Sequence, residues 1–347
     1  MTEKQIAANH NASSRAQAAR VPWVDLIKGI CIVSVVAMWV DRHLGLQSGW
    51  LHAYAIFARP FRMPDFFLIS GLFLDKVIDR PWKIYLDRKV LHYIYFVLLW
   101  ALLTLIIGEW ILNRPPSLSV AAEDYILYIA QPTGSLWFIT MLPIYFVVTK
   151  FIRNIHSSAV ILCAAYLYFF PINTGIHLVD WFGEYYFYFY TGYAGSRYIF
   201  KMADWANERN ILGAAYISGW AAANAVITTR YSSSWTEHLF LFMVMGYSGI
   251  LALIFLSRLA ASFLAFRWLA YLGENSIAVY LGFYIPLLFA GFAARRVGID
   301  LRIGVFPTFV CLFCVVMPIL LHFVIARTPL NFVFSRPKSL SITKQRS

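Results

Sequence analysis

Residues 91–112 read LHYIYFVLLWALLTLIIGEWIL, a continuous apolar run whose acidic residue, Glu109, lies close to its end. About 20 mostly apolar residues let a helix cross the ~30 Å hydrocarbon core of a bilayer. This run therefore predicts a membrane-spanning helix, and nine similar runs predict further spans. The expected spans are residues 25–44, 54–74, 91–112, 135–150, 158–171, 182–198, 211–229, 236–256, 268–289 and 304–326.

The composition of the whole chain also indicates a membrane protein. Of 347 residues, 60% are hydrophobic and 13% are charged, whereas in soluble domains about half are apolar and about a quarter charged. Long continuous runs differ from the short alternating strands of a membrane β-barrel, and helices satisfy their own backbone hydrogen bonds in lipid. We therefore predict an all-α, polytopic transmembrane helical bundle of about ten spans, with the lipid bilayer as its partner.

The basic residues predict an orientation. The net charge of +12 does not indicate a nucleic-acid partner, because the basic residues are scattered between apolar runs. Most of them lie in alternate loops and at both ends of the chain, so the positive-inside rule predicts N-in/C-in topology. The cluster of Arg295, Arg296 and Arg302 opposes it. Residues 1–20 are expected to be a disordered cytoplasmic tail, and residues 329–347 a basic cytoplasmic tail.

Cysteine spacing offers one possible metal motif. Cys311 and Cys314 have C-x-x-C spacing, which elsewhere suggests zinc or redox chemistry. No second pair of ligands accompanies them, so we interpret both as small buried hydrophobes and expect no metal and no bound cofactor.

One face of the first expected span is polar at both ends. At about 100° per residue, that face carries Asp25, Lys28, Trp39, Arg42 and His43. Charges inside a membrane are rare and frequently functional, so the face is a candidate lining for a polar cavity. Alternatively, the charged residues form pairs at the two membrane surfaces, reached by long side chains.

The second expected span contains RPFRMPDFFLISG, residues 59–71. Arg59 and Arg62 lie one turn apart, and Pro64 interrupts the helical hydrogen bonds before the apolar run. Because arginine is a planar, permanently charged donor suited to phosphate or carboxylate, we expect substrate or acyl-donor contact here. An interfacial anchor is the alternative.

The third span opens with Arg88, Lys89 and His92. These residues suit a phosphate-rich cytosolic donor, although a solvated loop end with the same charges is the alternative.

Four motifs resemble those of membrane acyltransferase family 3, in the same order and across residues 22 to about 325. They are Asp25–Gly29, Phe61–Gly71, Ser135–Phe138 and Gly273–Leu281. The Phe61–Gly71 stretch is the most specific of them. The chain is most similar to short, single-domain bacterial inner-membrane members, and the resemblance defines residues 21–328 as a transmembrane acyltransferase-3-like domain.

The resemblance implies a multi-pass protein of the inner membrane that transfers groups other than amino-acyl groups. Members of this kind move an acetyl or succinyl group from acyl-CoA to a hydroxyl of a polysaccharide, glucan or lipid-linked sugar. The reaction needs a base, an oxyanion donor and a positive clamp for the donor's phosphates.

The resemblance and the polar residues of spans one and two together give the candidate site residues. Arg62 and Ser70 of the specific motif are the catalytic candidates. Residues expected to bind substrate or donor are Asp25, Lys28, Arg42, Arg59, Arg88, Lys89, His92, Trp137, Asn275, Ser276 and Tyr280.

The chain departs from the family where acid–base chemistry is expected. Family members usually have a histidine at the position of Trp39 and often one at Phe283, and a tryptophan cannot accept a proton. The usual Arg-x-x-Arg of span three is Lys89-Val-Leu-His92 here. His43, one turn beyond Trp39 and displaced by ~6 Å, is the candidate replacement base, so His43→Ala is expected to abolish transfer. A surface histidine is the alternative.

Two functions of different classes follow. The first is an O-acyltransferase with an altered base, and the second is a catalytically degenerate relative that acts as a translocator or assembly partner. A secondary transporter of unrelated fold would show inverted repeats with paired broken helices, whereas the sequence predicts one broken helix, in span two.

Overall fold

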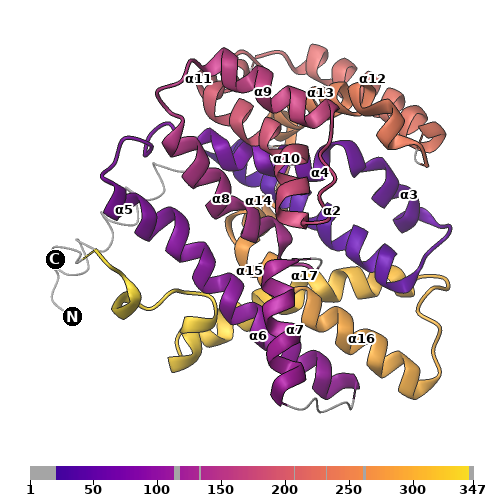
Figure 1. The fold of residues 1–347 in the computed structure, drawn as a ribbon. Coiled ribbons are helices and arrows are strands. Elements are labelled where there is room, and N and C mark those ends of the chain that lie inside the picture. The colour runs from indigo at the N-terminus through magenta and orange to yellow at the C-terminus, as the bar shows by residue number, and fades with distance from the viewer. Residues whose placement is uncertain are drawn as a thin grey trace, which may run out of the picture.

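The computed structural model describes residues 21–112, 118–132, 134–206, 208–231, 233–260 and 263–343. All regular structure in this part of the chain is helical, and no strand occurs in it (Figure 1). The prediction of an all-α fold is confirmed. The predicted tail over residues 1–20, and residues 344–347 of the predicted C-terminal tail, lie outside the described residues.

Helices coincide with all ten expected spans, and five of the described helices are long and apolar enough to cross a membrane, or up to six with one bent pair. The span count of ten and the N-in/C-in orientation therefore stay predictions. The coinciding helices are α2 (Pro22–Leu44), α3 (Trp50–Phe57) with α4 (Arg59–Leu72), α6 (His92–Leu112), α8 (Trp137–Phe151), α9 (Ser157–Phe169), α10 (His177–Ala194), α12 (Asn210–Tyr231), α13 (Leu239–Ala260), α14 (Arg267–Glu274) with α15 (Ser276–Gly282) and α16 (Tyr284–Val297), and α17 (Phe306–Ile325).

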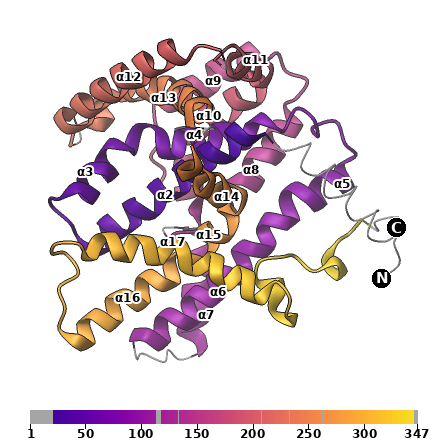
Figure 2. The same cartoon turned by 180° about the vertical axis from the view of Figure 1, so that it is seen from behind.

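Three further helices were not expected: α5 (Trp82–Leu86), α7 (Leu118–Ala130) and α11 (Ser196–Ala206). A π-helical turn over Asp87–Leu91 joins α5 to α6. Helices α2 and α4 lie near the centre of the molecule, and the view from behind shows α14 against α2 (Figures 1 and 2).

The second expected span is broken between α3 and α4, at Ala58. Pro60 has no N–H to donate to the carbonyl of Ile56, which separates the two helices. The helix then continues through Pro64, so the predicted interruption lies earlier than expected. Pro64 leaves the Pro60 carbonyl without its helical partner, and that carbonyl faces α13, where a Cβ on Gly246 would lie 2.8 Å from it.

The expectation of a single broken helix was wrong. The ninth expected span is divided into α14, α15 and α16, and α15 and α16 are bent by 40°. Pro286 lacks the N–H that would bond the Gly282 carbonyl, which accounts for the second break.

Glycines hold the central helices unusually close. A Cβ on Gly29 of α2 would lie 1.9 Å from the Leu269 carbonyl of α14, and one on Gly71 of α4 would lie 2.2 Å from the Phe189 carbonyl of α10. Small residues at such contacts let helix backbones approach within a membrane. Helix α4 is thereby held against α10, it also packs on α2, and it presents residues at both of its ends to cavities.

Candidate functional site

The cavity beside the second half of α4 is named the lysine pocket here. It has a volume of about 180 Å³, and Lys28 and Lys89 reach it from α2 and from the π-helical turn. The rest of its lining is largely aromatic and apolar. The predicted site residues that it brings together are Lys28, Ser70, Lys89, Ser276 and Tyr280.

Contacts orient the polar groups of the lysine pocket. Lys28 Nζ lies 3.7 Å from Asp25 Oδ1, and Lys89 Nζ lies 4.9 Å from the centre of the Phe146 ring. The Tyr280 hydroxyl accepts a 3.1 Å hydrogen bond from the Phe138 amide. These contacts place two cations at the rim of an apolar cavity.

Ser70 is less suited to nucleophilic chemistry than the motif suggests. Its hydroxyl donates a 2.8 Å hydrogen bond to the Phe66 carbonyl of its own helix, an arrangement common for serine within helices. A nucleophilic serine instead donates to a base. In this structure Ser70 lines the pocket as a hydrogen-bond acceptor.

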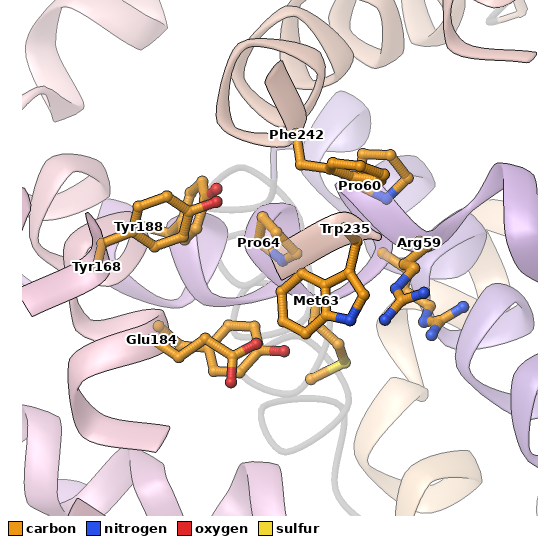
Figure 3. Close-up of a pocket in the computed structure, with 11 residues that line it drawn as sticks. Arg59, Pro60, Met63, Pro64, Tyr168, Glu184, Tyr188, Trp235 and Phe242 are labelled. Atoms are coloured by element: carbon orange, nitrogen blue, oxygen red, sulfur yellow. The ribbon is translucent and has the colours of Figure 1, made fainter. Parts of the chain in front are cut away.

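The cavity beside the first half of α4, named the arginine pocket here, has a volume of about 160 Å³. Figure 3 shows the Glu184 carboxylate on one side of it and guanidinium groups on the other, with Trp235 between. The Arg59 guanidinium lies 4.6 Å from the centre of the Trp235 ring, a cation–π contact. The lining residues are Arg59, Pro60, Arg62, Met63, Pro64, Tyr168, Glu184, Tyr185, Tyr188, Trp235 and Phe242.

Arg62 is held in place by the neighbouring helix, and Glu184 lines the same pocket. Arg62 Nη1 donates a 2.7 Å hydrogen bond to the Ala55 carbonyl of α3, across the break in the second span. Glu184 and its chain neighbour Tyr185 both line the same pocket from α10. The arginine pocket thus contains groups of opposite charge that face a shared space (Figure 3).

A single aromatic layer separates the two pockets. The buried Phe67 ring lies 4.6 Å from the ring of Phe138, which lines the lysine pocket, and 5.2 Å from that of Tyr185, which lines the arginine pocket. Trp137, a predicted binding residue, belongs to this layer, with ring centres 5.7 Å from Phe67 and 5.0 Å from Trp181.

The two positions that depart from the family lie side by side. The rings of Trp39 and Phe283 are 6.3 Å apart, and Tyr284 lies 5.5 Å from Trp39. Trp39 Nε1 is buried and has no hydrogen-bond partner among the described residues. Where family members place histidines, this chain has an aromatic cluster.

His43 lies apart from both pockets. It is exposed at the end of α2, with its ring 6.4 Å from that of Tyr284 and its Nε2 3.3 Å from where a Cβ on Gly291 would lie. Neither described lining includes it, and its role as base stays a prediction. Arg42 is likewise exposed at the end of α2.

The remaining predicted residues lie elsewhere. Asn275 donates a 2.9 Å hydrogen bond to the Tyr271 carbonyl at the end of α14, which is a helix-terminating contact. Arg88 and His92 line a third cavity, below the C-terminal segment. The predicted group of Arg88, Lys89 and His92 is therefore divided between two cavities.

Several polar groups near the arginines were not predicted from the sequence. Glu184 and Trp235 come from α10 and from the turn before α13, and no spacing links them to α4. His52 Nδ1 lies 2.9 Å from Asp41 Oδ1, joining α3 to α2. Gly45 and Gly49, which both have positive φ, lie in the connection between these helices. Two glycines so close together are the sequence feature that could have predicted this tight reversal, because glycine adopts positive φ readily.

Comparisons with known proteins agree with the motifs. A family model described as an acyltransferase domain of the acyltransferase 3 type matches residues 21–324. The inner membrane protein YcfT of Escherichia coli (strain K12) is 34% identical over 90 residues, which are 22% of this chain and 25% of YcfT. The match thus spans about a quarter of that relative's length. No solved structure matches the chain significantly.

Proposed function

Because the chain belongs to the acyltransferase 3 family of multi-pass inner-membrane proteins, we propose that it moves an acyl group from acyl-CoA to a carbohydrate or glycan hydroxyl. One observation carries the proposal. Helix α4 presents a lysine-rimmed apolar pocket at one end and an arginine, glutamate and tryptophan pocket at the other. Two substrates of different chemistry suit this pair of pockets.

The lysine pocket suits the acyl donor. Lys28 and Lys89 converge on it from separate elements, and lysine is a common phosphate-binding residue. Its apolar walls suit the uncharged arm and acyl end of the donor, in keeping with the apolar lining of most ligand pockets.

The arginine pocket suits the acceptor. Trp235 offers a flat aromatic face beside hydrogen-bonding groups, which matches a ligand with both apolar ring faces and hydroxyl groups. Among its described lining residues, Glu184 is the carboxylate and hence the side chain able to accept a proton at neutral pH. We assign Glu184 as the general base.

The proposed acyl transfer uses Glu184 and Arg62, which line opposite sides of the arginine pocket (Figure 3). Glu184 takes the proton of the acceptor hydroxyl while the hydroxyl oxygen bonds to the acyl carbon. Arg62 stabilises the developing oxyanion. The carbon–sulfur bond then breaks as the carbonyl reforms, and the departing CoA thiolate takes up the proton that Glu184 accepted. Since Phe67 lies between the pockets, its ring has to turn aside for the thioester to reach the acceptor.

The aromatic pair of Trp39 and Phe283 favours a second candidate, in which the chain has lost chemistry and works as a translocator or assembly partner. If catalysis has been lost, the histidines of the family are free to be replaced by residues that cannot transfer protons. Trp39 and Phe283 are such replacements, and they contact each other.

A labelling experiment separates the two functions. Membranes containing the chain are incubated with isotope-labelled acetyl-CoA or succinyl-CoA and a glycan acceptor. Labelled acceptor above an empty-vector control, lost in Glu184→Gln, supports transfer. Movement of substrate across the membrane without labelling supports the second function.

A further inference from the structure

The segment Arg336–Thr343, which we name the strap, folds back onto the start of the third expected span. Its anchor is the buried carboxylate of Asp87. Oδ1 lies 2.6 Å from Arg336 Nη2 and accepts a 3.1 Å hydrogen bond from the Ile342 amide. Oδ2 accepts hydrogen bonds of 2.6 and 2.7 Å from the hydroxyls of Ser341 and Thr343. A carboxylate bonded four times holds the strap firmly in place.

The strap closes one side of a cavity of about 720 Å³, named the strap pocket here. Asp87 compensates the charge of Arg336, with both side chains at most 9% exposed. Arg88 and Lys338 form no ion pair among the described residues, so the cavity keeps an excess of positive charge. Its lining is Asp87, Arg88, His92, Arg336, Pro337, Lys338, Ser339, Ser341 and Thr343.

This lining matches the chemistry of a phosphate group. Arginine and lysine side chains donate charge-assisted hydrogen bonds to phosphate oxygens, and serine and threonine hydroxyls add further donors. The walls contain Pro337 and the His92 imidazole, but no Phe, Tyr, Trp or large aliphatic side chain. An anionic, strongly hydrogen-bonding ligand suits the cavity better than an apolar one.

The strap pocket is adjacent to the lysine pocket. Lys89 lines the lysine pocket while its neighbour Arg88 lines the strap pocket, and Tyr93 and His92 divide in the same way one turn later. Consecutive helical residues point about 100° apart, so the same helical turn serves both cavities. A ligand lying over this turn can place one end in each.

We propose that the strap pocket binds phosphate groups, which in the acyl transfer belong to the nucleotide end of acyl-CoA. This assignment rests on the proposed function. The same phosphate chemistry occurs in the headgroup of an anionic phospholipid, so the test distinguishes the two sources. In either case the C-terminal strap supplies ligand-binding residues, Lys338 above all.

The test measures binding of adenosine 3′,5′-bisphosphate, with adenosine as the uncharged reference, to the purified full chain in lipid-free detergent by calorimetry. Lys338→Ala removes one cation from the strap, and Lys83→Ala removes the same charge from an exposed site on α5. We expect Lys338→Ala to weaken bisphosphate binding about tenfold, as loss of one charged hydrogen bond predicts, and Lys83→Ala to leave it unchanged. Anionic phospholipid co-purifying with each variant is measured by mass spectrometry.

Each outcome decides the proposal. Bisphosphate binding weakened only in Lys338→Ala supports the nucleotide as the source. Loss of phospholipid in that variant, without bisphosphate binding in any, supports a lipid headgroup. Equal binding of both probes in all variants overturns the strap site, and so does no binding of either probe by the wild type when Lys338→Ala keeps the same amount of phospholipid. Failure of the proposed function is seen separately, as absence of acyl transfer by the wild type.

Discussion

The Phe67 ring lies 5.2 Å from the ring of Tyr185, and this contact forms the partition between the two pockets of the molecule. Glu184, the chain neighbour of Tyr185, lines the same cavity from α10, so the partition lies next to the proposed base. A reaction between substrates in separate pockets needs such a partition, because it excludes water from the thioester until the acceptor is bound.

Replacing the Phe67 ring by a smaller side chain is expected to let water hydrolyse the acyl donor in the absence of acceptor. Phe67→Leu keeps an apolar side chain but removes the ring, so water gains access to the thioester. We expect CoA release in the absence of acceptor to rise relative to the wild type, measured with a thiol reagent. Phe309→Leu, on the exposed side of α17, is the matched control and should release no additional CoA.

Removing the proposed base is expected to lower kcat by about 100- to 10,000-fold. Glu184→Gln keeps the size of the side chain and removes proton acceptance, so acceptor labelling should fall while the protein still inserts. His43→Ala, made in parallel, tests the base predicted from the sequence. If His43→Ala abolishes labelling and Glu184→Gln does not, the base lies at the end of α2.

Lys89 is expected to act on donor binding. Loss of its charge in Lys89→Ala should raise KM for acyl-CoA about tenfold, the effect of about 1.4 kcal/mol, with little change in KM for the acceptor. Initial rates at varied acyl-CoA give the value. Lys201→Ala, an exposed lysine on α11, is the control, and an equal rise in both variants would point to net charge instead of contact.

The close approach of α4 and α10 is expected to tolerate no side chain. A Cβ on Gly71 or Gly192 would lie 2.2 or 2.0 Å from a backbone carbonyl of the opposite helix. Alanine at either position should destabilise the chain by about 1–3 kcal/mol and lower Tm in detergent. Gly219→Ala, with nothing within 4 Å, should leave Tm unchanged or raise it.

The strap is expected to detach when its anchor loses charge. Asp87→Asn weakens the bonds from Arg336, Ser341 and Thr343, so trypsin should cleave after Lys338 faster than in the wild type. Asp300→Asn removes the exposed carboxylate paired with Arg302 and should leave the cleavage rate unchanged. Protection of Lys338 in Asp87→Asn would contradict this anchoring.

The sequence predicted well those features that arise within single segments. Apolar runs identified the helices because a span in lipid must be continuous and apolar, and the motifs identified the family. The pairing of Arg59 with Arg62 also followed, since residues three apart share a helix face. Arg88 and Lys89 are consecutive, so their side chains point in different directions and line different cavities. Their similar chemistry had suggested that they act as a single group.

By itself, then, the amino-acid sequence determined the helical membrane fold, the family and the cations on α2, α4 and the π-helical turn. Only the tertiary structure decided which distant groups meet them: Glu184 and Trp235 beside the arginines, Phe283 beside Trp39, and Arg336 on Asp87. The physical reason is that local patterns report each helix's own preference for lipid, whereas contacts between helices depend on close packing at glycines, which single-chain periodicity does not encode.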